Sequence, residues 1–600
     1  MRWRFGCGYL LGGLLMILSL HSNDALQLKS GYYEKAALEL KSLIGDMLQE
    51  DFRLLDLKSM LDNGLHCTAC TLVTEIINDK RSYLKFNRRY MDILLRGACS
   101  VLQSANLMSA YECNGLVNVY SDTVLYLINN LNDTRMICPI LFQPYSCTDV
   151  QKPEYSISIN TDSPKPKRAS SFKDGAQLRF LQITDVHFDP TYKPGSNAKC
   201  MEHLCCMSSS GRADNAADRA GYWTDYRDCD VPDYFIEDTF DHISKNEKFD
   251  YIYFTGDIIY HKLWATSKTM NLRDIYHFWR MFKDAFGPTK VFPILGNHEV
   301  HPCNLYPPEY MNKGKFSIQW LFNATAEFWK DFLPAEALET VRKGGYYSVS
   351  PKEGFRVIAI NSNIGYYYNF WLVLDDQDPY GQLQWLSDEL QKAEDNNEVV
   401  HILSHVTAGT EMASSWAEQL RLIIRRYHNV IGGIFNGHTH IDEFNLYYAF
   451  DGKPISVAHN GGSLTPYSDV NPNYKIYTVD PTNFEIFDFE TYMVNLTEAN
   501  RNWRERPRWQ KQYSLRSEYD LQDASPESMH LLTKRLARDA ELRELYYQNS
   551  VRYGTPSLAN GCDKDCQTKL VCNIVNTVNS DTSYCDQLQK QMEYKEHAKK

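Results

Sequence analysis

The chain has 600 residues, of which 43% are hydrophobic and 23% charged, and a formal net charge of −12. Its length exceeds what one hydrophobic core supports, so we expect two to four domains. The acidic balance argues against a general nucleic-acid binder, which would be basic.

The first 25 residues have the features of a secretory signal peptide. Arg2 and Arg4 form the charged start, an apolar run covers 10–20, and small and polar residues extend through Ala25. This run is too short to span a bilayer, although a retained membrane anchor is the alternative interpretation. No later run of 18 apolar residues occurs. We therefore expect a soluble, monomeric chain that is secreted, lysosomal or both.

The cysteines also indicate export. Cys7 lies in the predicted signal, and the other fifteen fall mostly in tight groups, which predicts disulfides in an exported chain. An odd number leaves one thiol without an intrachain partner, and the isolated Cys303 is the candidate. Three sequons agree with a secretory route and predict glycosylation at Asn132, Asn323 and Asn495.

The block 63–151 contains six cysteines among helix-forming residues with apolar positions at helical spacing. Six cysteines allow fifteen connectivities. The pattern resembles a saposin B-type domain, and this resemblance implies amphipathic helices that open against lipid. It also implies the pairs Cys67–Cys147, Cys70–Cys138 and Cys99–Cys113. The alternative is a small disulfide-linked helical module that only packs on the next domain.

A Pro-rich linker is predicted over 152–177. It contains three prolines, several serines and a basic cluster at Lys165, Lys167 and Arg168. Such a composition is typical of a domain boundary. A solvated linker is the simpler interpretation, and contact of the cluster with anionic lipid is the alternative.

From residue 178 to 490, apolar strand-like runs alternate with helical stretches. The predicted strands are 178–184, 249–255, 290–295, 356–360, 399–403 and 430–435, and the predicted helices include 234–244, 272–286 and 380–393. This alternation predicts an α/β domain with a largely parallel sheet. The run 457–479 predicts further strands.

The last part, 491–600, is predicted to be a helical subdomain. Ser525 followed by Pro526 is a favourable helix start, with an N-cap and a proline at the first position. Four cysteines predict two local bridges, Cys562–Cys566 and Cys572–Cys585.

Metal-seeking residues follow five of the predicted strands, at Asp185 and His187, Asp257, Asn297 and His298, His405, and His438 and His440. Side chains at the carboxyl ends of parallel strands converge on one crevice. His nitrogens and Asp oxygens are the ligands of zinc-type ions, and two such ions need a shared ligand. Asp257 is the natural bridge. Alternate residues of an extended segment share a face, so we expect Asp185 and His187 to point the same way.

These motifs, D-x-H, G-D, G-N-H-E, S-H and G-H-T-H, resemble the calcineurin-like metallophosphoesterase superfamily. Together with the saposin-like block, the linker and the Cys-rich tail, they resemble the acid sphingomyelinase family over about residues 60–590; the stretches 378–386 and 437–444 are similar to that family. The resemblance implies a two-sheet β core flanked by helices, preceded by the all-α saposin-type domain and followed by the helical subdomain. It implies hydrolysis of sphingomyelin to ceramide and phosphocholine by a water activated by two zinc ions, with the saposin-type domain presenting the lipid.

The resemblance also implies residue roles. One zinc ion would be bound by Asp185, His187, Asp257 and His440, and the other by Asp257, Asn297, His405 and His438. His261 and His298 would face the phosphate, and Tyr467 would contact the substrate. Further bridges would be Cys200–Cys205 and Cys206–Cys229. A family disulfide has no cysteines here, near Asn363 and Glu411, so the rim loops could be looser.

Three other functions fit parts of the sequence. Gly256-Asp257-Ile258-Ile259-Tyr260 matches the G-D-x-x-Y motif of purple acid phosphatases, in which the tyrosine binds ferric iron, but His187 stands where that family has glycine. A nucleotide phosphodiesterase would have no need of a lipid-handling block. A lipid-transfer protein with an inactive site would have no need of all seven ligands.

Overall fold

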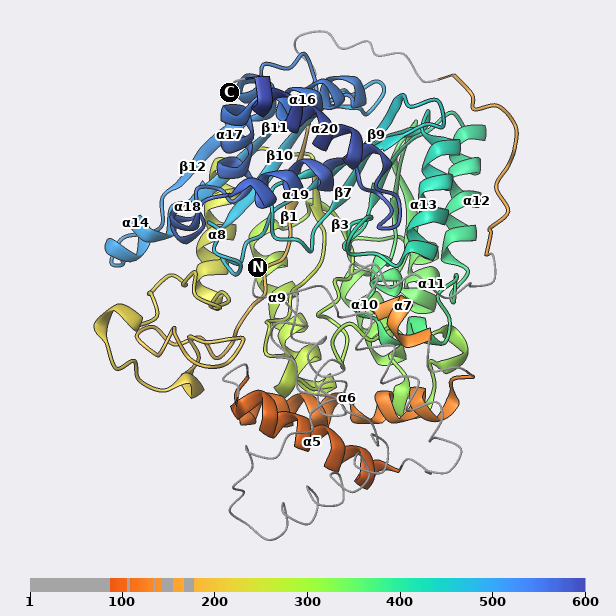
Figure 1. Cartoon of the computed structure of the whole chain (residues 1–600). Coiled ribbons are helices and arrows are strands. Elements are labelled where there is room, and N and C mark those ends of the chain that lie inside the picture. Colours follow the sequence, from red (N-terminus) through yellow and green to blue (C-terminus); the bar gives the residue numbers. More distant parts are fainter. Residues whose placement is uncertain (1–86, 105–107, 133–135, 142–154, 167–176, 599–600) are drawn as a thin grey trace.

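The computed structural model describes residues 87–104, 108–132, 136–141, 155–166 and 177–598 (Figure 1). The predicted signal peptide, Cys67, Cys70, Cys147 and part of the predicted linker lie outside these residues. No helix of the described part is long and apolar enough to cross a membrane.

Two six-stranded sheets form the centre of the molecule. The first has the order β12-β11-β10-β1-β2-β3 and the second β4-β5-β6-β7-β9-β8. The strands of the first sheet are β1 (Leu178–Ile183), β2 (Tyr251–Phe254), β3 (Lys290–Pro293), β10 (Asn473–Val479), β11 (Ile486–Val494) and β12 (Trp509–Ser514). Those of the second are β4 (Tyr347–Lys352), β5 (Phe355–Ala359), β6 (Val399–Leu403), β7 (Ile431–Asn436), β8 (Phe444–Tyr448) and β9 (Pro454–Asn460).

Both sheets are mixed, which corrects the expectation of a largely parallel core. β1, β2 and β3 run parallel, but β10, β11 and β12 extend the sheet antiparallel from β1. In the second sheet β5, β6, β7 and β9 are parallel, with β4 and β8 antiparallel at the two edges. Antiparallel strands thus flank the parallel core on one side in the first sheet, where β3 is the free edge, and on both sides in the second sheet. Of these strands, β4, β11 and β12 are partly exposed, and their half-polar pattern is weaker than that of a strand buried on both faces.

The sheets pack face to face, and aromatic side chains fill the space between them. Phe180 of β1 contacts Phe355 and His401 of the second sheet. The Tyr253 hydroxyl donates to His401 Nδ1 at 2.7 Å, and His401 Nε2 donates to the Phe484 carbonyl at 2.6 Å. Burial lowers the pKa of His401 to about 4, so this buried imidazole is neutral and fully hydrogen-bonded.

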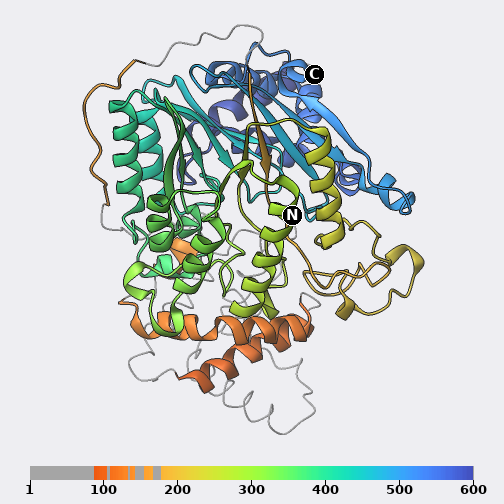
Figure 2. The same cartoon turned by 180° about the vertical axis from the view of Figure 1, so that it is seen from behind.

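Helices cover the outer faces of this sandwich (Figures 1 and 2). α8 (Asp233–Asn246) and α9 (Lys268–Phe286) pack on the first sheet, where Phe278 contacts Phe254. α12 (Gln382–Asp395) and α13 (Ser414–Tyr427) pack on the second sheet, and α10 (Gln319–Trp329) and α11 (Ala335–Gly344) lie before β4. The three helices predicted in this region are therefore present, with ends shifted by a few residues.

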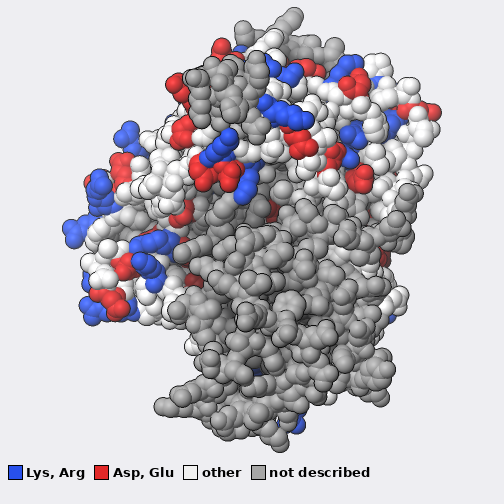
Figure 3. Space-filling model, viewed as in Figure 1, with Lys and Arg blue, Asp and Glu red and all other residues white. Residues whose placement is uncertain are grey.

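The C-terminal region is helical as predicted, but it begins later. β11 runs through residue 490, and β12 adds a further strand to the first sheet. The helices are α14 (Leu496–Arg501), α15 (Leu515–Tyr519), α16 (Pro526–Arg538), α17 (Ala540–Ser550), α18 (Thr555–Asn560), α19 (Lys564–Val575) and α20 (Ser583–Ala598). Ser525 caps α16, and Pro526 is its first residue, as predicted. Basic and acidic side chains are interspersed on the described surface of this region (Figure 3).

The N-terminal helices α5 (Arg88–Ser104), α6 (Ala110–Asn130) and α7 (Ile137–Leu141) lie on one end of the core (Figure 1). α6 packs directly on the core: the Tyr120 hydroxyl donates to the Cys303 carbonyl, and the Tyr126 ring contacts Trp371. This part of the predicted saposin-type block is helical and docked.

Five of the predicted disulfides join described residues: Cys99–Cys113, Cys200–Cys205, Cys206–Cys229, Cys562–Cys566 and Cys572–Cys585. Cys138 is also disulfide-bonded, and Cys303 is a buried free thiol. Among the sequon residues, Asn132 and Asn323 are exposed. Asn495 is half-buried, and its side-chain oxygen caps α14.

Candidate metal centre

The seven predicted ligands come from loops that follow β1, β2, β3, β6 and β7, at the carboxyl ends of both sheets. Their backbones are unusual, because five of them have a left-handed φ: Asp185 (50°), His187 (49°), Asp257 (62°), His438 (78°) and His440 (59°). A non-glycine residue in this region costs about 1–3 kcal/mol, and such residues gather at functional sites. The expectation of an extended Asp185–His187 segment is therefore wrong, although both side chains still reach the site.

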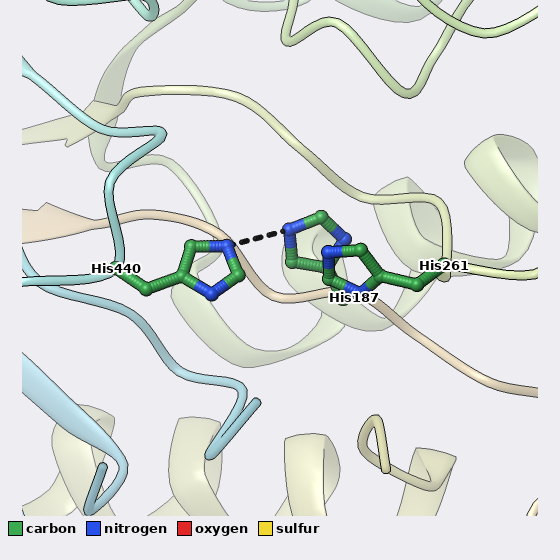
Figure 4. Close-up of side chains that lie close together, drawn as sticks. All are labelled: His187, His261 and His440. Atoms are coloured by element: carbon green, nitrogen blue, oxygen red, sulfur yellow. Dashed lines mark hydrogen bonds between the residues drawn. The ribbon is translucent and has the colours of Figure 1, made fainter. Parts of the chain in front are cut away.

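The first cluster consists of Asp185, His187, Asp257 and His440. Nε2 of His187 lies 3.1 Å from Nε2 of His440 and 3.5 Å from Oδ2 of Asp257. Nε2 of His440 lies 3.5 Å from Oδ1 of Asp185. Figure 4 shows His187 and His440 meeting through these ring nitrogens, with His261 stacked on His187.

The second cluster consists of Asp257, Asn297, His405 and His438. Nε2 of His405 lies 3.0 Å from Oδ2 of Asp257 and 2.9 Å from Oδ1 of Asn297. Nδ1 of His438 lies 2.9 Å from the same Asn297 oxygen. Oδ2 of Asp257 therefore faces both clusters. The other oxygen, Oδ1, accepts a hydrogen bond from the His298 backbone N–H at 2.9 Å, which fixes the carboxylate between them.

The atoms that meet in each cluster are acceptors, and this fits cations. Nδ1 of His187 donates to the Ile259 carbonyl at 2.8 Å, and Nδ1 of His440 donates to the Tyr467 carbonyl at 3.1 Å. In the neutral rings, each Nε2 atom then carries a lone pair and no proton. The two Nε2 atoms nevertheless lie only 3.1 Å apart, without a hydrogen between them. Two nitrogens of a tetrahedral zinc ion, with bonds of about 2.0–2.1 Å, lie about 3.3 Å apart. A shared cation removes the repulsion between them.

The second cluster repeats this arrangement. Nδ1 of His405 donates to the Thr255 carbonyl at 2.7 Å, so in the neutral ring Nε2 carries a lone pair and faces two oxygens, an arrangement that needs a proton or a metal ion between them. Nδ2 of Asn297 donates to Asn304 at 2.8 Å, which turns Oδ1 of Asn297 toward the histidines. Burial lowers the pKa of His405, but Asp257 and Asp185 outweigh it and raise this pKa to about 9. The cluster thus strongly favours positive charge, as a metal site does.

Two buried side chains hold the ligand loops together. Glu299 accepts hydrogen bonds from the Ile258 backbone N–H and, at 2.7 Å, from the Gly296 backbone N–H, and so joins the loops after β2 and β3. Asn271 of α9 donates from Nδ2 to the Glu299 carbonyl at 3.1 Å. Gly296 is required for close approach, since a Cβ there would overlap the Asp257 carboxylate.

His261 lies beside the first cluster. Its ring stacks on His187 at 3.9 Å between centroids and on Tyr467 at 4.0 Å. Its Nδ1 lies 2.9 Å from Oδ1 of Asp230, which also accepts from Thr465 Oγ1. Burial and the neighbouring histidines lower the pKa of His261, while burial raises that of Asp230. This pair holds one proton close to the metal ligands.

His298 and Tyr467, the other predicted contacts of the phosphate and substrate, are both buried. The His298 ring lies 4.7 Å from the rings of His187 and His261, and its Nδ1 has no hydrogen-bond partner among the described residues. Tyr467 is 1% exposed, and its hydroxyl donates to the His203 carbonyl at 2.8 Å. Tyr467 thus lies behind His261 in the structure.

Tyr260 occupies a different environment from the ligands. Burial raises its pKa, and the charged groups around it include Asp189, Asp274 and Arg273. None of these is a predicted ligand, whereas His187 lies in the first cluster beside His440 and Asp257.

Backbone hydrogen bonds join the rim loops near Asn363 and Glu411. The Ala413 N–H donates to the Gly365 carbonyl at 2.8 Å, and the Tyr367 N–H donates to the Glu411 carbonyl at 3.3 Å. The ring of Tyr366 lies 4.6 Å from that of His438, whose Nε2 is 3.8 Å from Glu411 Oε2. The rim thus contacts the second cluster directly.

The C-terminal region supports the first cluster through Arg552, which sequence reasoning missed. This fully buried guanidinium donates to the His440 carbonyl at 2.8 Å, to the Asn471 carbonyl at 2.7 Å and to Ser463 Oγ at 3.1 Å. No motif marks an arginine 112 residues away from its partner. A buried cation in a helical tail is recognised only once the fold is known.

Comparison with known proteins agrees with this geometry. Residues 178–442 match the calcineurin-like phosphoesterase family, and residues 458–594 match the acid sphingomyelin phosphodiesterase C-terminal region. The chain is 38% identical to sphingomyelin phosphodiesterase of Bos taurus, over 68% of this chain and 66% of the relative, and 37% identical to that of Homo sapiens, over 66% and 63%. It thus spans just under two thirds of the length of these two relatives. It is 31% identical to sphingomyelin phosphodiesterase 1 of Caenorhabditis elegans, over 86% of this chain and 92% of the relative.

Proposed function

Because the chain belongs to the acid sphingomyelinase family of metallophosphoesterases, we propose that it hydrolyses sphingomyelin to ceramide and phosphocholine. The observation that carries this proposal is the pair of buried ligand clusters that share Oδ2 of Asp257. A shared carboxylate between two sets of His and Asp ligands is the arrangement of two-metal hydrolases.

Two metal ions, when bound, would supply Lewis acidity and lower the pKa of the attacking water. Asp185, His187 and His440 would bind one ion, and Asn297, His405 and His438 the other, with Asp257 shared. Because the donors are oriented by carbonyls and amides of the fold, they need little rearrangement on binding.

His261 and His298 would act on the phosphate itself. Nδ1 of His261 pairs with the Asp230 carboxylate, which stabilises a protonated ring beside the first cluster, so we propose that Nε2 of His261 protonates the departing oxygen of ceramide. His298 is at the same edge, and its unpaired Nδ1 can donate to a phosphoryl oxygen. Burial lowers the pKa of both rings below the reference value of about 6.5, so their imidazolium forms need acid, which suits an acidic compartment.

We propose that both ions are zinc. Histidine and aspartate ligands suit zinc, although manganese and iron accept similar sets. We expect the purified protein to contain two equivalents of zinc per chain by mass spectrometry of metals and to be colourless. A purple protein with a tyrosinate absorption band would instead indicate an iron site that uses Tyr260.

A lipid substrate agrees with the domain organisation that we propose for the rest of the chain. We propose that 63–151 forms a saposin-type domain that presents sphingomyelin, that 152–177 links it to the catalytic domain, 178–490, and that 491–600 completes the fold as a C-terminal subdomain. A signal peptide over 1–25, disulfides and N-glycans at Asn132, Asn323 and Asn495 would accompany export to lysosomes or the cell exterior as a monomer. Tyr467 would act on the substrate through His261, on which its buried ring stacks.

The test is hydrolysis of sphingomyelin in mixed liposomes at about pH 5, with bis-p-nitrophenyl phosphate as a soluble control. We expect both to be cleaved, chelation to stop both reactions, and added zinc to restore them. Cleavage of the soluble ester alone would leave the metal site in place but refute the lipid assignment, and nucleotide diesters would then be the next substrates. Cleavage of neither would refute the proposed function.

A further inference from the structure

Helix α6 contacts the loop 200–206 through a buried ion pair. Glu112 of α6 is 1% exposed, accepts from the His203 backbone N–H at 3.2 Å and pairs with His203 Nδ1 through its other oxygen. Burial lowers the pKa of His203, but the bond to Glu112 outweighs it and raises the pKa above its ordinary value. Two disulfides, Cys200–Cys205 and Cys206–Cys229, restrict the conformations available to this loop.

This loop in turn holds the residue that stacks on His261. The His203 carbonyl accepts the hydroxyl of Tyr467 at 2.8 Å. The Tyr467 ring lies parallel to that of His261, with 4.0 Å between centroids and 14° between planes. A continuous series of contacts therefore runs from α6 through His203 and Tyr467 to His261.

A second contact reaches His261 along the chain. The segment that follows it, η6 (Leu263–Ala265), packs on α6 at Gly115. A Cβ at Gly115 would lie 2.6 Å from the Trp264 carbonyl oxygen, so only glycine permits this approach. Nζ of Lys262 also lies 5.9 Å from the centre of the Tyr111 ring. α6 thus contacts both the residues after His261 and the loop that holds its stacking partner.

We propose that α6 positions His261 for proton transfer through Glu112 and Gly115, so that the N-terminal helical region acts on the chemical step as well as on the lipid. This inference rests on the proposed function, because it uses the role of His261 given there. Glu112 and Gly115 are positioning residues. A proton donor displaced by about 1 Å can cost about 10²-fold in rate.

The experiment uses the full-length protein and two soluble phosphocholine esters, one with a p-nitrophenol leaving group and one with a short alcohol. Only the alcohol needs a proton to leave. We expect Glu112→Gln and Gly115→Ala to lower kcat for the alkyl ester by about 10-fold or more, with KM and the nitrophenyl rate little changed. Glu112→Asp should recover part of the loss.

The matched control is Asp122→Asn, which removes an exposed ion pair of α6 with Arg88 and should behave as the wild type. Zinc content and unfolding midpoint are measured for every variant. Equal losses on both esters, or an unchanged kcat in both variants, would overturn the inference while the function stands. If Glu112→Gln does not fold, the kinetics of Gly115→Ala test the inference, because this substitution removes no charge. If the wild type cleaves neither ester, the proposed function itself fails.

Discussion

Replacement of Asp257 by asparagine is expected to lower kcat by about 10³-fold or more and to remove both metal ions. Oδ2 of Asp257 lies 3.5 Å from His187 Nε2 and 3.0 Å from His405 Nε2, one histidine of each cluster. Asparagine keeps the size of the side chain and an acceptor for the His298 N–H. The loss of kcat and of metal is therefore due to the missing negative charge of the carboxylate that both clusters share.

Metal content and hydrolysis of bis-p-nitrophenyl phosphate are the two measurements. Asp185→Asn is the informative comparison, because Asp185 is a proposed ligand of the first cluster alone, with its Oδ1 3.5 Å from His440 Nε2. We expect that variant to retain about one equivalent of metal, and the exposed Asp214→Asn to retain two. One full equivalent retained by Asp257→Asn would show that the carboxylate is not shared.

The sequence predicted the parts of the site that depend on strand ends. Each apolar run is terminated by a polar residue, and in a sheet such termini meet at one edge, so Asp257, Asn297 and His405 could be placed together. Three helices and the start of α16 were predicted for similarly local reasons, such as the cap at Ser525. The same locality explains the two C-terminal bridges, whose cysteines are close in sequence.

Other parts of the site depend on long-range contacts that leave no local pattern. Arg552 reaches the His440 carbonyl, and Glu112 reaches His203 across 91 residues. The left-handed backbone of Asp185 and His187 was also missed, because local preference favours an extended chain there. Contacts with the neighbouring loop, such as the His187 N–H to the Asp257 carbonyl at 3.1 Å, impose the strained conformation.

The run 457–479 predicted β9 and the antiparallel β10, but the antiparallel strands β4, β8, β11 and β12 were missed for a related reason. β12 lies at the edge of the first sheet and carries three consecutive polar residues, Gln510, Lys511 and Gln512, between the buried Trp509 and Tyr513. A half-exposed edge strand of this kind has no continuous apolar run, so the charged composition favoured a helical prediction. The buried Tyr513 of β12 nevertheless completes a polar network around Asp442.

That network gives the largest effect expected on stability. Lys475 of β10 is fully buried and pairs with Oδ1 of Asp442, while Thr491 and Tyr513 donate to Oδ2 of Asp442 at 2.8 and 2.9 Å. Lys475→Met would leave the carboxylate buried without its cation. Removing one partner of a buried ion pair costs about 3–5 kcal/mol, and we expect that loss in the free energy of unfolding, measured with urea.

Two comparisons separate this effect from the loss of any lysine. Lys453→Met breaks an ion pair with Asp451 whose side chains are 81% and 55% exposed, and it should change stability by less than about 1 kcal/mol. The double variant Lys475→Met with Asp442→Asn removes both charges but keeps acceptors for Thr491 and Tyr513, and it should recover most of the stability. A single Lys475→Met variant as stable as Lys453→Met would contradict the pairing.

The same variant links stability to the metal centre. Asp442 lies two residues after His440, and its backbone N–H donates to the Ser550 carbonyl at 3.0 Å beside Arg552. An unpaired carboxylate would be drawn toward solvent and would displace this segment, so Lys475→Met should weaken metal binding in the first cluster more than in the second. The double variant should restore both the stability and the metal binding of the first cluster, because the displacement comes from the unpaired charge and not from the lost lysine side chain.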